Sequence, residues 1–176
     1  GGTVEAPVGE VKRLVLSNSS NLGLATTASA ATLVDVEKPV LSAPKLLIDQ
    51  ASGGRWALFG TGRYLVPDDK TTLAPQAYYG IREPTNSSGF TLGAVDTADI
   101  EEVGDIETFP DSSIRNSDGT AVIIDTNVVE TFGELISVLR SKGGWRIDFA
   151  VPAGKSAERN FTDTALFGNV ALFTTF

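Results

Sequence analysis

A short apolar run that ends at two glycines constrains this chain more than any other stretch. Residues 56–59 (Trp-Ala-Leu-Phe) form the run, and Gly60 and Gly62 follow it one residue apart. A short apolar run between turn residues is typical of a strand that is buried on both faces. A glycine at a strand end marks a bulge, a bend or a close backbone crossing. The run therefore predicts a central strand with such a feature at its end.

The Gly-x-Gly spacing also occurs in loops that bind phosphate. Those loops need a third glycine and a helix that opens directly behind it. Here residues 63–66 (Arg-Tyr-Leu-Val) form another strand-like run, which Pro67 closes. The sequence therefore favours a tight β-turn over a nucleotide site.

The composition excludes several classes of site. The chain has 176 residues, and none of them is histidine or cysteine. Ser-His-Asp catalysis, Cys-His catalysis and the usual zinc sites are therefore excluded within this chain. The formal net charge of −8 disfavours nucleic-acid binding, because an acidic domain repels phosphate backbones. The length suits one domain, and no apolar stretch is long enough for a membrane-spanning helix.

Aromatic and β-branched residues cluster in short runs between turn residues, which is typical of an all-β domain. We expect strands at residues 10–16, 32–36, 45–49, 56–59, 76–81, 121–125, 145–149, 165–167 and 170–173. The second and third prolines, Pro39 and Pro44, bracket an edge strand or an extended link. Residues 22–31 are either a strand pair or a surface excursion, and residues 82–89 are expected to be a surface loop.

One segment has the pattern of a helix. Residues 131–142 place apolar side chains at helical spacing, with Glu134 early and Arg140 and Lys142 late. Two glycines end the segment. We expect a short helix that packs against the domain, because a helix of this length is not stable alone.

Acidic residues gather in residues 96–107 without the spacing of a metal loop, so a solvated face is favoured over a cation site. Residues 116–120 (Asn-Ser-Asp-Gly-Thr) resemble the middle of an EF-hand loop. The first ligand would fall on Ile114, which cannot bind calcium, so a turn is expected. Trp56 and Trp145 both lie inside strand patterns and are expected in the core.

Two blocks of this sequence resemble the C-terminal β-propeller of the PilY family. The members of this family are type IV pilus biogenesis and tip-adhesin proteins. The first block is similar to the family's proline-rich lead-in, its "F-F-G-T-G-K-Y" strand and turn, and its "S-F-Y-G-I" strand. The second is similar to the "G-W-Y-L-D-L … V-I-F-T-T" pair. The residues of this chain that carry the motifs are Pro39, Pro44, Trp56, Phe59, Gly60, Gly62, Tyr64, Tyr79, Gly80, Gly144, Trp145 and Asp148.

The resemblance implies an all-β fold of several short antiparallel strands, most like part of a β-propeller, with one short helix. We expect residues 1–176 to form a single β domain that is a fragment of a larger propeller, with residues 1–35 loosely assigned. The open strand edges of a cut propeller would pair with another chain. The PilY family carries a calcium loop of Asp-x-Asp-x-Asn type, which does not occur here, so no metal ligand or cofactor site is assigned.

The resemblance also implies a function. We expect a non-enzymatic, extracellular component of the type IV pilus machinery at the cell surface, which acts in assembly, retraction control or tip adhesion. Its expected partners are pilin or minor pilins and a host surface ligand. Two alternatives stay open: a secreted β module that binds glycan or protein, and a glycan-active enzyme that uses a carboxylate pair. No residue is assigned a catalytic role.

Overall fold

The computed structural model describes residues 9–17, 27–86, 89–90, 93–153, 155–168 and 170–176, and its regular secondary structure is mostly strand. The strands are β1 (Glu10–Ser17), β2 (Thr27–Asp35), β3 (Lys45–Ile48), β4 (Arg55–Gly60), β5 (Ala77–Arg82), β6 (Thr85–Asn86), β7 (Gly89–Phe90), β8 (Ile100–Glu102), β9 (Ile106–Thr108), β10 (Ile114–Asn116), β11 (Val122–Ile124), β12 (Asn127–Val129), β13 (Gly144–Asp148), β14 (Ala165–Phe167) and β15 (Val170–Leu172). The helices are α1 (Phe132–Leu139) and the two 3-10 helices η1 (Pro67–Lys70) and η2 (Thr97–Asp99). The predicted all-β fold with one short helix is confirmed.

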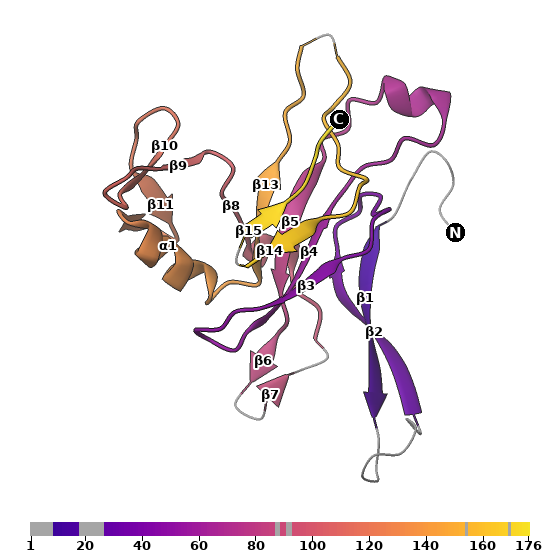
Figure 1. Cartoon of the computed structure of the whole chain (residues 1–176), viewed down its shortest axis with the longest axis horizontal. Helices are drawn as coiled ribbons and strands as arrows, with labels where there is room; N and C mark the ends of the chain where they lie inside the picture. The colour runs from indigo at the N-terminus through magenta and orange to yellow at the C-terminus, as the bar shows by residue number, and fades with distance from the viewer. Residues whose placement is uncertain (1–8, 18–26, 87–88, 91–92, 154, 169) are drawn as a thin grey trace.

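A five-stranded sheet in the order β3-β4-β5-β13-β8 forms the centre of the molecule (Figure 1). Its strands pair antiparallel except β13 and β8, which are parallel. The apolar run in β4 is buried from Trp56 to Gly60, as the sequence predicts for a strand covered on both faces. The predicted hairpin between β3 and β4 is also confirmed.

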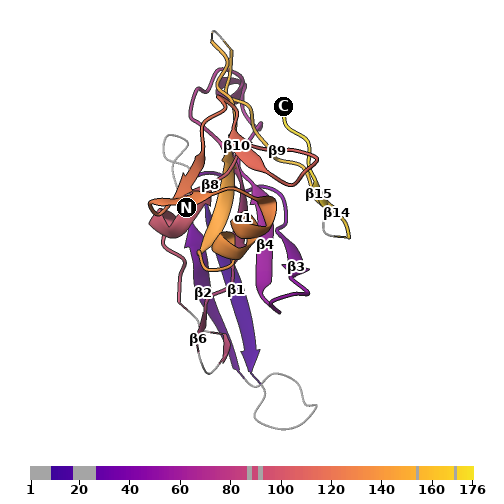
Figure 2. The ribbon, with the colours of Figure 1, turned by 90° about the vertical axis from the view of Figure 1, so that its left-hand side faces the viewer.

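Two antiparallel ribbons cover opposite faces of this sheet, as Figures 1 and 2 show together. Val34 of the β1–β2 ribbon and Val36, just after β2, belong to one core with Phe59 and Tyr79 of the sheet. The β14–β15 hairpin covers the other face. There the rings of Tyr78 and Phe173 stack with centroids 3.8 Å apart. The alternation of side chains along β4 and β5 thus supplies two cores at once.

A third core lies beside the sheet, where α1 packs against the short ribbons β9–β10 and β11–β12 (Figure 1). Leu135 and Leu139 are the buried face of α1, so the predicted helix is confirmed. The Thr131 side chain accepts a hydrogen bond from the backbone of Glu134, and Glu134 in turn accepts from the backbone of Thr131. This reciprocal cap satisfies backbone groups that have no partner within the helix.

The prediction of a strand at residues 63–66 is wrong. This segment is a loop that leads into η1, because the Asp69 carboxylate accepts hydrogen bonds from the backbone of Leu65 and Val66. A side-chain oxygen thus takes the donors that a neighbouring strand would otherwise use.

For three other segments, the prediction was left open or differs in detail from the structure. Residues 39–44 contain no strand and form an extended link. Residues 82–89 include the short pair β6–β7 rather than a loop alone. Residues 18–26 lie outside the described residues, so the prediction for 22–31 is tested only from Thr27 onward, where β2 begins. Within the part of the chain that the structure describes, no helix has the length and apolar character to cross a membrane.

Candidate binding surface

The motif strands lie next to one another in the central sheet, since β5 lies between β4 and β13. Gly80 and Trp145 are directly paired across β5 and β13. A Cβ on Gly80 would lie 2.3 Å from the Trp145 indole, so the ring occupies the space above the glycine. A Cβ on Gly144 would lie 2.4 Å from the Gly80 carbonyl oxygen. These residues are therefore fixed by close packing between the two strands.

The glycines that end the central apolar run permit a backbone crossing, and the expected tight β-turn does not form. Asn160 donates its backbone N–H to the Thr61 carbonyl at 2.9 Å. A Cβ on Gly60 would lie 2.2 Å from the Asn160 side chain, and one on Gly62 would lie 2.4 Å from Cβ of Arg159. Gly62 also has a φ of 130°, a backbone conformation that is strained for any residue other than glycine.

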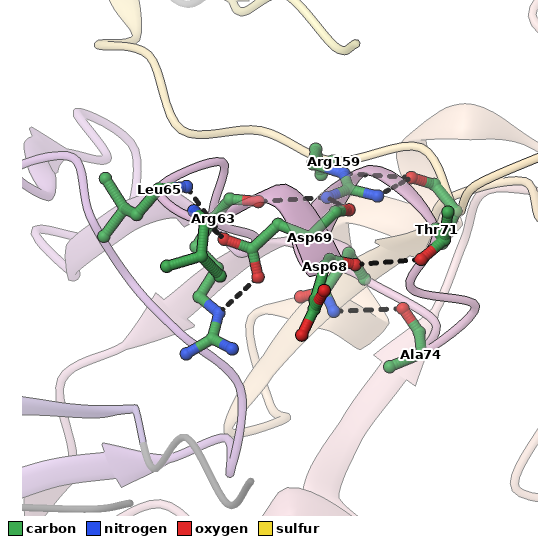
Figure 3. A network of polar contacts seen from close by, with 10 residues as sticks. Arg63, Leu65, Asp68, Asp69, Thr71, Ala74 and Arg159 are labelled. Carbon is green, nitrogen blue, oxygen red and sulfur yellow. Dashed lines mark hydrogen bonds and ion pairs between the residues drawn. The ribbon is translucent and has the colours of Figure 1, made fainter. Parts of the chain in front are cut away.

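Arg159 and Asp69 hold the loop after β4 from inside (Figure 3). The Asp69 carboxylate is 2% exposed and accepts hydrogen bonds from Arg63 Nε at 2.7 Å and from the backbone of Leu65 at 2.8 Å. The Arg159 guanidinium is buried and donates to the carbonyls of Ala157, Arg63 and Asp69. Asp69 thereby joins three residues of the loop, and Arg159 ties the loop to a segment near the C-terminus through the carbonyls of Arg63 and Asp69.

The electrostatics of this network favour the charged state of Asp69. Burial alone raises the pKa of a carboxyl group, but the hydrogen bonds from Leu65, Val66 and Arg63 outweigh it and hold the pKa of Asp69 below its usual value. Asp69 is therefore a structural anion. Its neighbour Asp68 is exposed, so the two do not form an acid–base pair.

The fixed loop presents an aromatic row to solvent. Tyr64 is 50% exposed and stacks on Phe161 at 6.1 Å between ring centroids, and Phe161 stacks on Phe176 at 4.9 Å. Lys70 Nζ and the Arg159 guanidinium carbon each lie 5.9 Å from the Tyr64 ring centre. We call Tyr64, Phe161, Phe176 and Lys70 the Tyr64 surface. Exposed aromatic rings with an adjacent cation are suited to contacts with a protein or a sugar ring.

A polar hollow of about 290 Å³ lies between β13 and the link after β2. It is lined by Tyr79, Lys38, Arg146 and Asp148, among others. Burial lowers the pKa of Lys38 and raises that of Tyr79. Arg146 Nε donates to Asp148 at 3.0 Å. Asp35 and Glu37 also line the hollow, so three acidic side chains face the two basic ones, Lys38 and Arg146.

A second hollow of about 360 Å³ is lined by Glu101, Glu102 and Asp105 together with residues of β10 and β11. Among the described residues, no group of three or more acidic side chains is arranged to hold a metal ion. Residues 116–120 form the expected turn, in which Gly119 donates its N–H to the Asn116 carbonyl at 2.8 Å.

The structure brings most of the motif residues together. Trp56, Phe59, Gly60, Tyr79, Gly80, Gly144 and Trp145 lie in the three adjacent strands, and Pro39 accepts a hydrogen bond from Gly62 at 2.8 Å. Asp148 ends β13 and is paired with Ala77 of β5, with its side chain exposed, while Pro44 and Tyr64 lie outside the three strands. Arg159 and Phe161 were missed, because residues 151–159 have the composition of a polar loop. Phe161, the large apolar residue just after this polar stretch, was the available signal.

Comparisons with known proteins give a likeness of structure. No family model matches the chain, and no curated protein matches its sequence. Among solved structures, the chain is similar to the crystal structure of the Pseudomonas aeruginosa PilY1 C-terminal domain, with 19% identity and a TM-score of 0.48. The match covers 78% of this chain and 28% of that chain, so this chain spans little more than a quarter of its length.

Proposed function

We propose that this chain is a non-enzymatic component of the type IV pilus machinery that acts by binding a protein partner outside the cell. The observation that carries the proposal is the assembly of the PilY-like motifs. Residues from separate parts of the chain, such as Gly80 and Trp145, meet as one packed unit in β5 and β13. The motifs thus form a common framework, and the loops between them are free to carry contacts.

The Tyr64 surface is the proposed contact site. Its loop belongs to the motif that resembles the family, yet Tyr64 contributes little to the core, since half of its surface is exposed. The Asp69–Arg159 network holds the loop in one conformation, which reduces the entropy that binding would cost. Pilin or a minor pilin is the proposed partner.

Localisation tests the proposal directly. Gold-labelled antibodies against this domain should label pilus fibres or tips on intact piliated cells and on sheared pili. Label in secreted fractions with none on pili would reject it.

A binding measurement tests the site. Tyr64→Ala should lower co-purification with pilin at least about tenfold, because exposed aromatic anchors contribute strongly to interfaces. Phe109→Ala is the matched control, since Phe109 is also an exposed aromatic but lies outside the Tyr64 surface. Equal losses in both variants would reject the Tyr64 surface as the contact site.

A glycan-binding module is the second candidate. The exposed rings of Tyr64 and Phe176, which each stack on Phe161, favour it, because sugar rings pack on aromatic faces. Saturable glycan binding without turnover, together with no label on pili, would favour this candidate over the first.

A further inference from the structure

The two edges of the central sheet differ in how they are protected. The edge strand β8 carries Glu101 and Glu102, and charged residues on an edge oppose pairing with another chain. The other edge strand, β3, has the sequence Lys-Leu-Leu-Ile. Its side chains Leu46 and Ile48 are 78% and 56% exposed. An apolar edge without a proline or a bulge inside the strand is open to pairing.

The hydrogen-bond pattern shows which backbone groups are available on β3. Asp49 donates its N–H to Gly54 at 2.8 Å, and β3 pairs with β4 so that Leu47 lies opposite Trp56. In an antiparallel ladder, hydrogen-bonded pairs alternate with non-bonded pairs. The backbone groups of Lys45, Leu47 and Asp49 therefore point toward β4. Those of Leu46 and Ile48 point away from it, toward the open edge.

We propose that β3 pairs with β3 of a second copy of this chain, antiparallel and about a two-fold axis at Leu47. The pairing that uses the outward groups of Leu46 and Ile48 sets Leu46 opposite Ile48 of the copy and Leu47 opposite Leu47. By symmetry it also sets each Lys45 opposite Asp49 of the other copy, whose carboxylate accepts two hydrogen bonds from Arg140 of its own chain. Three apolar pairs then match in a single register, and an opposite charge faces each Lys45.

The neighbouring registers do not match. A centre at Leu46 places Pro44 opposite Ile48, where proline has no N–H to donate, and it sets Lys45 against Leu47. A centre at Ile48 sets Leu47 against Asp49 and draws the tight turn after β3 into the ladder. The register centred on Leu47 is therefore the one that this segment selects.

This dimer is independent of the proposed pilus role, because β3 lies outside the Tyr64 surface. Sedimentation of the full chain from about 10 μM to about 1 mM should show a monomer–dimer equilibrium, as expected for a small interface. Combining Leu46→Lys with Ile48→Lys should raise the dissociation constant at least about a hundredfold, since like charges then face each other. Leu73→Lys is the matched control, because Leu73 is 61% exposed and lies outside β3.

A cross-link tests the register. The chain has no cysteine, so Leu47→Cys introduces a single thiol, and at a non-bonded pair the two Cα atoms lie within disulfide reach. Leu47→Cys should form a covalent dimer under mild oxidation. Leu46→Cys should not, although its position is more exposed, because the two copies of residue 46 lie two positions apart.

Three outcomes would overturn the proposal. The first is a wild-type chain that stays monomeric at about 1 mM, well above the dissociation constants of specific complexes. The second is an unchanged dimer in the double lysine variant. The third is faster cross-linking at Leu46→Cys than at Leu47→Cys, which would indicate random collisions.

Discussion

Two carboxylate–arginine contacts fasten peripheral segments to the central sheet, and they differ in burial. Asp69 lies inside the molecule and is paired with Arg63, while Arg159 donates to carbonyls around it. Asp49 lies at the turn between β3 and β4 and receives two hydrogen bonds from Arg140, at 2.7 and 3.1 Å. The Arg140 side chain is 33% exposed. One carboxylate–arginine contact therefore lies in the interior. The other is in contact with water, where an ion pair contributes much less to stability.

Removing the buried carboxylate should have the largest effect. Asp69→Ala removes the carboxylate that accepts hydrogen bonds from Arg63 Nε and from the N–H groups of Leu65 and Val66. We expect a loss of about 3 kcal/mol or more in the free energy of unfolding, measured by urea titration. Asp68→Ala is the adjacent control, since Asp68 is exposed, and should change the free energy by less than about 0.5 kcal/mol. Similar losses of unfolding free energy at both positions would show that the buried carboxylate contributes no more stability than an exposed one.

Arg159→Lys should have the next largest effect. The guanidinium donates to several carbonyls at once from a planar fork, and an ammonium group cannot reproduce that geometry. We expect a loss of about 2 kcal/mol in the urea titration. A variant as stable as the wild type would show that Arg159 acts only through its charge.

The two carboxylates should respond differently to salt when the pH is lowered. The pKa values of Asp69 and Asp49 are both lowered, Asp69 by backbone and Arg63 hydrogen bonds against the cost of burial, and Asp49 by hydrogen bonds from Arg140 and Ser52. Each carboxylate therefore stabilises the fold above its usual pKa of 3.8, and this stabilisation is lost as the pH falls through the lower folded value.

The free energy of unfolding should thus decline below about pH 4. Asp69→Asn and Asp49→Asn should each flatten part of that decline. The part due to Asp49 should shrink in about 1 M NaCl, because salt screens exposed pairs, while that due to Asp69 should persist. Equal salt sensitivity in the two variants would contradict the assigned difference in burial.

Arg140→Ala should have the smallest effect of the four. The pair is open to solvent, so its loss should destabilise the chain several-fold less than Asp69→Ala does. Thermal unfolding in low and high salt measures it, and the difference from the wild type should fall as salt rises. A loss as large as that of Asp69→Ala would show that the pair carries the attachment of α1.

The sequence predicted the elements whose signals are local. Trp56 to Phe59 form the buried strand expected from a short apolar run, and Thr131 to Lys142 contain the expected helix. The glycines at residues 60 and 62 indicated a bend or a crossing. The crossing segment itself could not be found, because nothing near Gly60 identifies Asn160 as its neighbour.

Non-local contacts explain the remaining errors. Residues 63–66 have strand propensity, but Asp69 takes their N–H groups. Arg159 lies in a polar segment and is nevertheless buried, because the carbonyls that accept from it come from a loop far away in sequence. The parallel pairing of β13 with β8 is also invisible to local patterns. The arrangement in propeller blades stays a prediction.

The position of β13 also affects how the chain is made. β13 lies between β5 and β8 in the sheet, yet it follows both along the chain. The β3–β5 meander can form early in synthesis, whereas the β5 edge stays open until β13 arrives. Closing such long loops slows folding to the range of about milliseconds to seconds, during which an open edge invites aggregation. Trp145 packs over Gly80 only when β13 docks, so its fluorescence in stopped-flow refolding should report that last step.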